Sequence, residues 1–500
     1  MEKKQEEASK AAKQEEKKSN NWPTLLATLI TGQVLTGMGL NVALHSILVV
    51  QVPQDTNRFM ADNQLNWAIA SCPLGAMAGC MLAMPVAPVL GARRLLMFSQ
   101  PLYALASLVV ALGQSFPLVL LGRLVMFIML GMSETTVRGY VSEIVPPNRR
   151  TLYTAILNTM VFASQAIGLL IAQYVHWTTF HIGAGFLPAG ICLAGLYFIH
   201  NSPKWLLSHG HSEEEALRAI RFFHGTEADA DSEVRNIQDS LRHMDVDGVS
   251  LPLWKLILQR ETLMPLLLAF GQLVIFIWSG GIGINYITSY ILQPVNLPLN
   301  DYQSAMLPLA VAAIFSVPTS FVIERFGRLP LLRVSGSLSG LGCATIAVFF
   351  YLPEALQQTL GWVVLVGATL TQYSFACIIA PIALTYVNEL LPNRTRTFCA
   401  NILMGMMNTM LFMFVKTFSP LTELIGFGGV FLLHMAVSGL QVVYATFCLP
   451  ETKGLSLERI QHLFQKVEKV AEAPLHVGDT EQGNNGKDNP ALNVAPSEWA

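Results

Sequence analysis

Apolar stretches of about twenty residues, separated by shorter polar segments, follow one another along most of the chain. A helix needs about twenty predominantly apolar residues to cross the hydrocarbon core of a bilayer. The pattern therefore predicts an all-α membrane protein with about twelve transmembrane helices. They are expected near residues 24–50, 66–89, 95–113, 118–140, 151–175, 181–200, 264–292, 304–323, 329–351, 359–388, 397–418 and 426–448.

Three polar segments interrupt this pattern and divide the chain. The first tail carries charges of both signs, and the last loses its apolar periodicity, as is typical of disordered segments. The middle segment contains "SEEEALRAIRFF", where Ser212 is a candidate N-cap, so short amphipathic helices under the membrane are favoured over a floppy linker. The predicted domains are a tail (1–22), a six-helix bundle (23–200), a helical linker (201–262), a second six-helix bundle (263–450) and a second tail (451–500).

Arginines gather in alternate loops of this pattern. Lysine and arginine near the ends of transmembrane helices favour the cytosolic side of the membrane. The loops that share one side contain Arg93, Arg94, Arg149, Arg150, Arg325, Arg328, Arg394 and Arg396. We therefore expect a multi-pass protein of the plasma membrane with both termini in the cytosol.

The composition agrees with a protein that is solvated by a lipid bilayer. Hydrophobic residues make up 52% of the chain and charged residues 13%, whereas roughly a quarter of a soluble protein is charged. The net charge of −2 argues against a nucleic-acid partner. The seven cysteines lack metal-ligand spacing, and no catalytic triad, phosphate loop or paired catalytic carboxylates can be found. We expect no metal site, no cofactor and no enzymatic activity.

Charged motifs recur in the two halves of the chain. "SEIVPPNRR" in the first half and "NELLPNRTR" in the second each place an arginine seven positions after a glutamate. "LGARRLL" after the second span is echoed by "RFGRLPLL" after the eighth. Such echoes at equivalent places indicate two parallel structural repeats.

These motifs resemble those of the facilitated sugar transporters of the major facilitator superfamily, the glucose-transporter-like carriers. The resemblance covers essentially residues 20 to 460, and "VKTFSPL" is more similar to the trehalose-transporter-like branch than to the hexose carriers. It implies a carrier that works by alternating access and functions as a monomer. The motifs that carry it are the two E-x6-R pairs, "GR" at Gly122–Arg123, E-R-x-G-R at Glu324–Arg328 and "PETKG" at Pro450–Gly454.

The resemblance also implies a set of gating residues on the cytosolic side, which bridge the two bundles and must separate for inward opening. The alternative is that the arginines only orient the protein, and we favour this alternative for Arg94, Arg149 and Arg394. Pro88 and Ala92 depart from the family pattern, so the latch of the first half is incomplete. Glu134 and Arg138 are expected to pair locally near the cytosolic end of the fourth span. The implied gating residues are Arg93, Glu143, Arg150, Arg328, Glu389, Arg396 and Glu451.

The residues that bind sugar in the family are mostly replaced. Aligned without gaps at Ser279–Gly280, the polar positions of the seventh span become Phe276, Ile277 and Ile282. A shift of three residues would instead place Asn285 at the last of these positions. The other apolar replacements are Phe162 in the fifth span, Ala312 in the eighth and Leu384 in the tenth.

Other polar residues are available to bind a substrate. Gln272, Ser279 and Tyr286 are seven residues apart, so they share one helix face. For each candidate the alternative is a hydrogen bond between helices, which membrane bundles use routinely. The predicted substrate-binding residues are Gln165, Gln272, Trp278, Ser279, Asn285, Tyr286 and Asn408.

We therefore expect facilitative uniport of a sugar, either a hexose or a disaccharide such as trehalose. Spans one, four and seven carry no acidic residue or lysine at mid-depth away from their ends, so ion coupling lacks its usual carrier. The run "GGIGIN" is expected to let the seventh helix bend. The alternatives are the same fold carrying a polyol or a more apolar solute, and a non-transporting sensor.

Overall fold

The computed structural model describes residues 22–52, 60–146, 149–224, 230–231, 234–235, 237–239, 253–292, 295, 297, 299–392, 395–453, 460 and 463–464. All regular elements in these residues are helical. The predictions for the two tails fall almost entirely outside the described residues. The same holds for much of the linker between residues 225 and 252.

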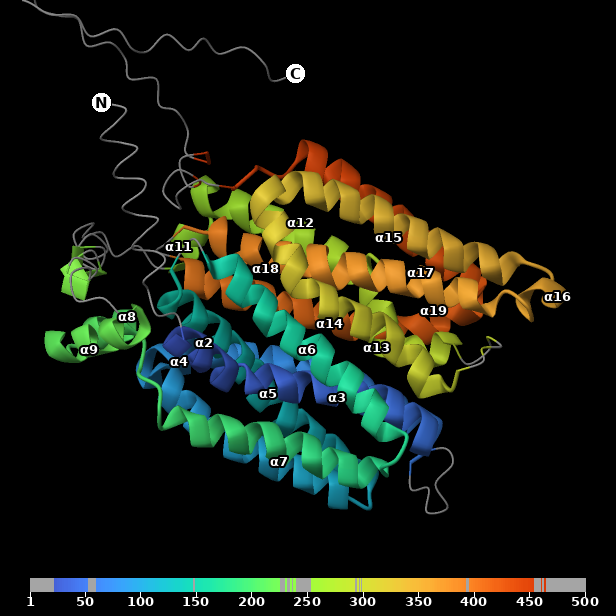
Figure 1. Ribbon diagram of the computed structural model, residues 1–500, viewed down its shortest axis with the longest axis horizontal. Coiled ribbons are helices and arrows are strands. Elements are labelled where there is room, and N and C mark those ends of the chain that lie inside the picture. The colour runs from blue at the N-terminus through green and yellow to red at the C-terminus, as the bar shows by residue number, and fades with distance from the viewer. Residues whose placement is uncertain are drawn as a thin grey trace, which may run out of the picture. The chain divides into compact units, whose positions relative to one another are not determined.

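The helices of the first half pack side by side, blue to green in Figure 1. The long helix α4 bends at Gly91, whose φ of +72° is outside the helical region, and so forms two spans. The helices of this half are α2 (Trp22–Thr31), α3 (Gln33–Gln51), α4 (Asp62–Leu112), α5 (Phe116–Ile144), α6 (Arg150–Ala172) and α7 (Trp177–Leu196).

The second half repeats this arrangement, yellow-green to red in Figure 1. Its last helix, α19, bends at Gly426, where φ is +71°. The elements are α12 (Arg260–Trp278), α13 (Gly281–Leu292), α14 (Asp301–Phe326), α15 (Arg328–Tyr351), α16 (Glu354–Gln357), α17 (Gly361–Ser374), the π-helical turn η3 (Phe375–Ile379), α18 (Ala380–Glu389) and α19 (Arg396–Phe447).

The described residues contain enough helix for twelve membrane crossings. Ten helical stretches are long and apolar enough to cross, and two of them, Asn63–Leu112 and Phe398–Phe447, are 50 residues long. A helix of that length spans roughly 75 Å, more than twice the thickness of a bilayer core. Because each of the two bends at a glycine, each provides two crossings. The predicted all-α membrane fold of two six-helix bundles is confirmed.

Glycines with positive φ stand at equivalent places of the two halves. Gly91 follows the second span with a φ of +72°, and Gly327 follows the eighth with a φ of +93°. A side chain is disfavoured at either place because the left-handed region is costly for residues other than glycine. A Cβ on Gly327 would also lie only 2.9 Å from Oε2 of Glu451. The repeated sequence motifs therefore mark two equivalent helix breaks.

The two halves meet mainly along three pairs of helices. α6 packs on α14, α4 on α19, and α3 on α13. The first half contributes Leu44 and Phe162 to a buried apolar cluster that also contains Phe276 and Phe414 of the second half. The interior of the protein is therefore continuous from one half to the other.

The linker forms short helices, two of which pack under the first half and one of which packs against the second. Its helices are α8 (Pro203–Ser208), α9 (Glu213–His224) and α11 (Leu253–Ile257), and Figure 1 shows α8 and α9 at one end of the helices. The backbone N–H of Glu215 donates to Oγ of Ser212 over 3.3 Å, so the predicted N-cap is confirmed. Oγ1 of Thr24 donates to the carbonyl of Phe223 over 2.7 Å, which fastens α9 to the first span.

Candidate functional site

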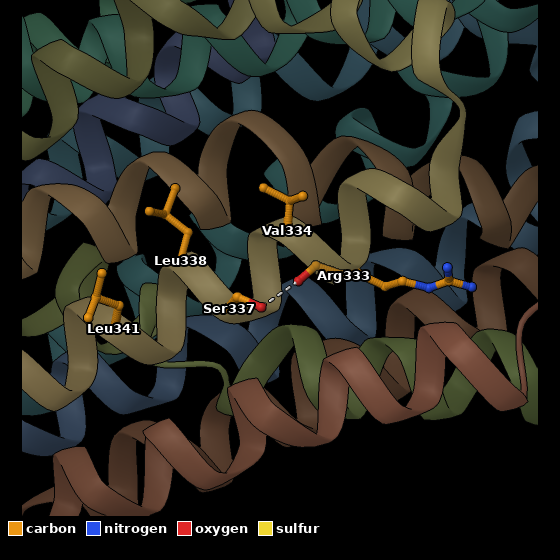
Figure 2. A pocket seen from close by; sticks show the side chains of 5 residues that line it. All are labelled: Arg333, Val334, Ser337, Leu338 and Leu341. Carbon is orange, nitrogen blue, oxygen red and sulfur yellow. Dashed lines mark hydrogen bonds between the residues drawn. The ribbon is translucent and has the colours of Figure 1, made fainter.

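One cavity among the described residues is a groove on the outer face of α15. It measures about 410 Å³ and is lined by five residues of this one helix (Figure 2): Arg333, Val334, Ser337, Leu338 and Leu341. Val334 and Leu341 are more than half exposed. Exposed apolar side chains on a spanning helix face lipid, so this groove belongs to the lipid-facing surface and not to a path across the membrane.

A second cavity lies between the two halves, and we call it the central cavity. Its volume is about 10 Å³, roughly the space of one water molecule. It contains two predicted substrate residues, Tyr286 of α13 and Asn408 of α19. The lining is Met38, Pro73, Ala76, Phe127, Leu130, Gly131, Glu134, Tyr286 and Asn408. The space that these residues leave between them in this conformation is therefore no larger than about one water molecule.

Tyr286 and Asn408 keep hydrogen-bonding capacity that other described residues do not use. Nδ2 of Asn408 donates to the carbonyl of Met404 over 2.9 Å, but its Oδ1 accepts no hydrogen bond from the described residues. The ring of Tyr286 lies 5.3 Å from that of His45, and its hydroxyl has no partner among the described residues. Both groups are available to a solute at this place.

Gln272 is engaged by another helix in this conformation. Nε2 of Gln272 donates to Oε1 of Gln441 over 3.0 Å, and Nε2 of Gln441 donates back to Oε1 of Gln272 over 3.1 Å. Both side chains are fully buried. The reciprocal pair joins α12 to α19. In this conformation Gln272 therefore makes a hydrogen bond between helices, which is the alternative to substrate binding.

Ser279 and Trp278 also make contacts within the second half. The carbonyl of Ser279 accepts from the hydroxyls of Ser339 and Ser438 over 2.9 and 3.2 Å. The ring of Trp278 packs edge-on against Phe414, with 5.3 Å between centroids. Neither residue lines the central cavity, and contact of either with substrate stays a prediction.

Gln165 and Asn285 connect the two halves beside the central cavity. Nε2 of Gln165 on α6 donates to the backbone carbonyl of Asn285 on α13 over 2.9 Å. Oε1 of Gln165 and Oδ1 of Asn285 are buried without hydrogen-bond partners. These two predicted residues therefore hold unsatisfied acceptors at the boundary between the halves.

The seventh span breaks where "GGIGIN" begins, as predicted. α12 ends at Trp278, α13 begins at Gly281, and Gly280 between them has a φ of +91°. A Cβ on Gly280 would lie 2.8 Å from Sγ of Cys343. Only glycine fits this position without strain, so the break is built into the sequence.

The apolar replacements of the family's sugar ligands lie in the packed interior. The ring of Phe276 lies 5.0 Å from that of Phe375, and Phe162 and Ile282 are buried in the same apolar cluster. None of these three is among the described residues that line the central cavity. Its apolar walls come instead from side chains such as Met38 and Phe127.

A charged cluster occupies the end of the second half that carries the basic loops, which we call the basic end. Nη2 of Arg328 lies 2.6 Å from Oε1 of Glu389, joining α15 to α18. Burial raises the pKa of the Glu389 carboxyl, and the Arg328 guanidinium partly offsets this rise. Glu451 accepts the backbone N–H groups of Arg328 and Leu329 over 3.1 and 3.0 Å, so it caps the first turn of α15.

Arg396 and Arg150 extend this cluster toward the first half. Nη2 of Arg396 donates to the carbonyl of Leu391 over 3.1 Å. Burial and the nearby positive charge of Arg150 lower the pKa of Arg396 to about 10. Arg150 also interacts electrostatically with Glu389, which is an interaction between the two halves.

The corresponding cluster of the first half is looser. Glu143 interacts with Ser202, Lys204 and Arg150. Nε of Arg93 is buried without a hydrogen-bond partner. The indole Nε1 of Trp205 donates to the carbonyl of Pro88 over 2.7 Å, at the loop where this chain departs from the family pattern.

Glu134 forms the predicted local ion pair but lies farther from the end of its helix than the sequence indicates. The predicted local pair is present, with Nη2 of Arg138 3.1 Å from Oε1 of Glu134. However, Glu134 also lines the central cavity, roughly three turns before the end of α5 at Ile144. Hydropathy alone does not reveal it, because a single glutamate barely lowers the mean of a long apolar helix.

Comparisons with known proteins agree with this architecture. The model of a family described as "Sugar (and other) transporter" matches residues 4–464. The proton:xylose symporter XylE, bound to 6-bromo-6-deoxy-D-glucose, superposes with a TM-score of 0.71 at 20% sequence identity. The match covers 89% of this chain and 98% of XylE, and it shows a shared fold.

Curated relatives are similar at low identity. The facilitated trehalose transporter Tret1 of Aedes aegypti is 25% identical over 88% of this chain, and the match covers 55% of that protein. The chain thus spans about half the length of this relative. Tret1 of Polypedilum vanderplanki is 24% identical over 86% of the chain, and the match covers 85% of that protein. Sugar transporter ERD6-like 7 of Arabidopsis thaliana is 28% identical over 77% of the chain and 82% of its own length. Because the family model matches nearly the whole chain, this protein belongs to the family of sugar and other transporters that the model describes.

Proposed function

We propose that the protein carries a sugar across the plasma membrane by facilitative uniport and alternating access. The observation that carries the proposal is a closed cavity between the two halves, with free polar groups on Tyr286 and Asn408. A site at the boundary of two repeats can open to either side when one half rocks against the other. The protein functions as a monomer, because one chain supplies both halves of this cavity.

Uniport is favoured over ion coupling by how the charges near the cavity are paired. Among the described residues of the cavity wall, Glu134 is the only carboxylate, and Arg138 compensates its charge. On the first span, Nδ2 of Asn41 donates to the hydroxyl of Tyr103 over 2.8 Å. A neutral amide there cannot carry a proton, so among the described residues no unpaired proton carrier faces the cavity.

The substrate proposed is a hexose or a disaccharide such as trehalose. Relatives from three insects, including those of Aedes and Polypedilum, carry the name of facilitated trehalose transporter. The cavity would have to enlarge greatly from about 10 Å³ to hold either sugar, as an alternating carrier does when it opens.

Gating is proposed to reside at the basic end, which faces the cytosol together with both termini. Arg328 and Glu389 form a direct ion pair within the second half, and Arg150 attracts Glu389 from the first half. Separation of the halves exposes these charges to water. Their attraction thus stabilises the conformation that is closed toward the cytosol.

A second candidate keeps the mechanism and changes the cargo to a polyol or a more apolar solute. Most of the central cavity is lined by apolar side chains, including Met38, Phe127 and Leu130. Each sugar hydroxyl that faces such a surface loses a hydrogen bond, at about 1–3 kcal/mol. A short polyol or a more apolar solute, with fewer hydroxyl groups than a hexose, suffers fewer such losses.

Radiolabelled uptake into cells that lack their own sugar carriers tests the proposal. Trehalose, glucose, fructose, xylose and a polyol are supplied in turn, and uptake is expected for at least one sugar. Uptake should be unchanged when an uncoupler collapses the proton gradient. Uptake of the polyol alone would favour the second candidate, and sensitivity to the uncoupler would replace uniport by symport.

A further inference from the structure

We propose that Glu134 is a hydroxyl-binding residue of the central cavity and that it determines which polyhydroxy solute the carrier accepts. This inference rests on the transport function proposed above and specifies its site. It comes from one carboxylate oxygen of Glu134 that is without a partner among the described residues, beside the central cavity between the two halves.

The position of Glu134 brings its carboxylate opposite the second half. α5 contributes it to the cavity wall, while α13 and α19 contribute Tyr286 and Asn408 to the same wall. The side chain of Glu134 is 13% exposed, and that of Arg138 is 15% exposed. The carboxylate is therefore largely screened from bulk water but still accessible.

The ion pair uses only one of the two carboxylate oxygens. Nε and Nη2 of Arg138 both lie 3.1 Å from Oε1 of Glu134. Oε2 has no hydrogen-bond partner among the residues that the structure describes. A carboxylate oxygen in a sheltered place is a strong acceptor, and the hydroxyl groups of a solute are donors that match it.

Arg138 holds this carboxylate in place and balances its charge. Its Nη1 donates to Oδ1 of Asn158 on α6 over 3.3 Å, so the guanidinium bridges two helices. Because the pair is neutral as a whole, the wall does not attract free ions as an isolated carboxylate would. The arrangement instead selects neutral solutes that donate hydrogen bonds.

The three free polar groups form a complementary set. Oε2 of Glu134 and Oδ1 of Asn408 accept hydrogen bonds, and the hydroxyl of Tyr286 both donates and accepts. A solute with several hydroxyl groups satisfies all three and so touches both halves at once. An apolar solute would strip water from Oε2 and give it no partner, which is unfavourable. Among the proposed cargoes, the geometry points to the more hydroxylated ones.

Uptake kinetics of two variants test this role. Glu134→Gln removes the charge but keeps the shape. The double variant Glu134→Leu with Arg138→Met removes both charges, which is often neutral for stability when apolar side chains of similar volume replace a buried pair. Glu214→Gln is the matched control, because Glu214 forms an i,i+4 pair with Arg218 over 3.6 Å on the exposed face of α9.

Uptake is measured for the sugar that the wild-type protein carries best, at equal surface abundance, with its monodeoxy analogues as competitors. Loss of a charge-assisted hydrogen bond should raise KM about tenfold to a hundredfold in both variants and leave the control unchanged. One deoxy analogue that competes weakly with the wild-type protein should compete as well as the parent sugar in the variants. This coupling identifies the hydroxyl that Glu134 binds.

Each other outcome overturns the inference. A double variant with wild-type KM and an unchanged analogue profile would show that the pair is only structural. If the double variant fails to reach the surface, the same result in Glu134→Gln overturns the inference. In both cases wild-type sugar uptake leaves the proposed function standing. Absence of sugar uptake by the wild-type protein would instead reject the proposed function, and this inference with it.

Discussion

Arg328 and Glu389 form an ion pair of 2.6 Å that ties the start of α15 to the end of α18. The pair lies within the second half, and Arg150 of the first half acts on Glu389 from outside it. The latch at the basic end therefore has an inner part, which fixes Glu389, and an outer part, which attracts the other half. Removing the carboxylate disables both parts at once.

Glu389→Gln should shift the carrier toward the inward-open conformation and reduce uptake. Loss of a charge-assisted hydrogen bond of about 1.5–3 kcal/mol corresponds to a shift of tenfold or more in a conformational equilibrium. Uptake at matched surface expression and accessibility of cysteines introduced at each end provide the measurement. Arg94→Ala is the control, because Arg94 is exposed at the same end and makes no predicted latch contact. Equal uptake in Glu389→Gln and wild type would contradict the gating role.

Gly280→Ala should reduce uptake by stiffening or straining the break between α12 and α13. A residue other than glycine in the left-handed region costs roughly 1–2 kcal/mol, and the added Cβ would press on Cys343. Gly439→Ala provides the matched control, since a Cβ there meets nothing within 4 Å. Both variants are compared by uptake and by thermal unfolding in detergent. A Gly280 variant as active and stable as the Gly439 variant would show that the break is not required.

Gln272→Leu should lower thermal stability rather than raise KM. The substitution leaves the buried amide of Gln441 without its partner, at about 1–3 kcal/mol. The double variant Gln272→Leu with Gln441→Leu removes both amides and should recover most of the stability. If the double variant is stable but its KM has risen, Gln272 contacts the substrate as the sequence analysis predicts.

Gln165→Ala should weaken closure on the side of the cavity away from the basic end. The variant loses the 2.9 Å hydrogen bond to the carbonyl of Asn285, which connects α6 to α13. The loss of about 1 kcal/mol should change the population of the closed state several-fold. Accessibility of a cysteine placed near Gln173, which accepts from Asn300 over 2.9 Å at that end, reports the change. Unaltered accessibility would indicate that this contact follows closure without stabilising it.

The sequence predicts the crossings well because lipid imposes one strong rule on every span. A backbone in hydrocarbon must form its own hydrogen bonds, so length and hydropathy determine where the helices lie. The break at Gly280 was also predictable from its glycine-rich run, and its positive φ disfavours other residues. Arginine-rich loops and repeated motifs then identified the two halves.

The site was less predictable because function there depends on which neighbour a polar group finds. Gln272 has the same residue type as a sugar ligand, but its partner is Gln441, far along the chain. Glu134 resembles a surface charge in a local pair, yet it faces the central cavity. Periodicity places residues on a helix face, but only the packing of several helices decides what that face meets.

The hydrogen bonds that cap α15 can form only after the last span has been synthesised. Its first N–H groups, at Arg328 and Leu329, are accepted by a carboxylate that follows the last span of the chain. A chain made from its N-terminus inserts α15 long before Glu451 leaves the ribosome. The first N–H groups of α15, the ninth span, therefore lack this acceptor until the twelfth span has been synthesised. A chain that stops just short of Glu451 contains every crossing and still lacks the contact that finishes its second half.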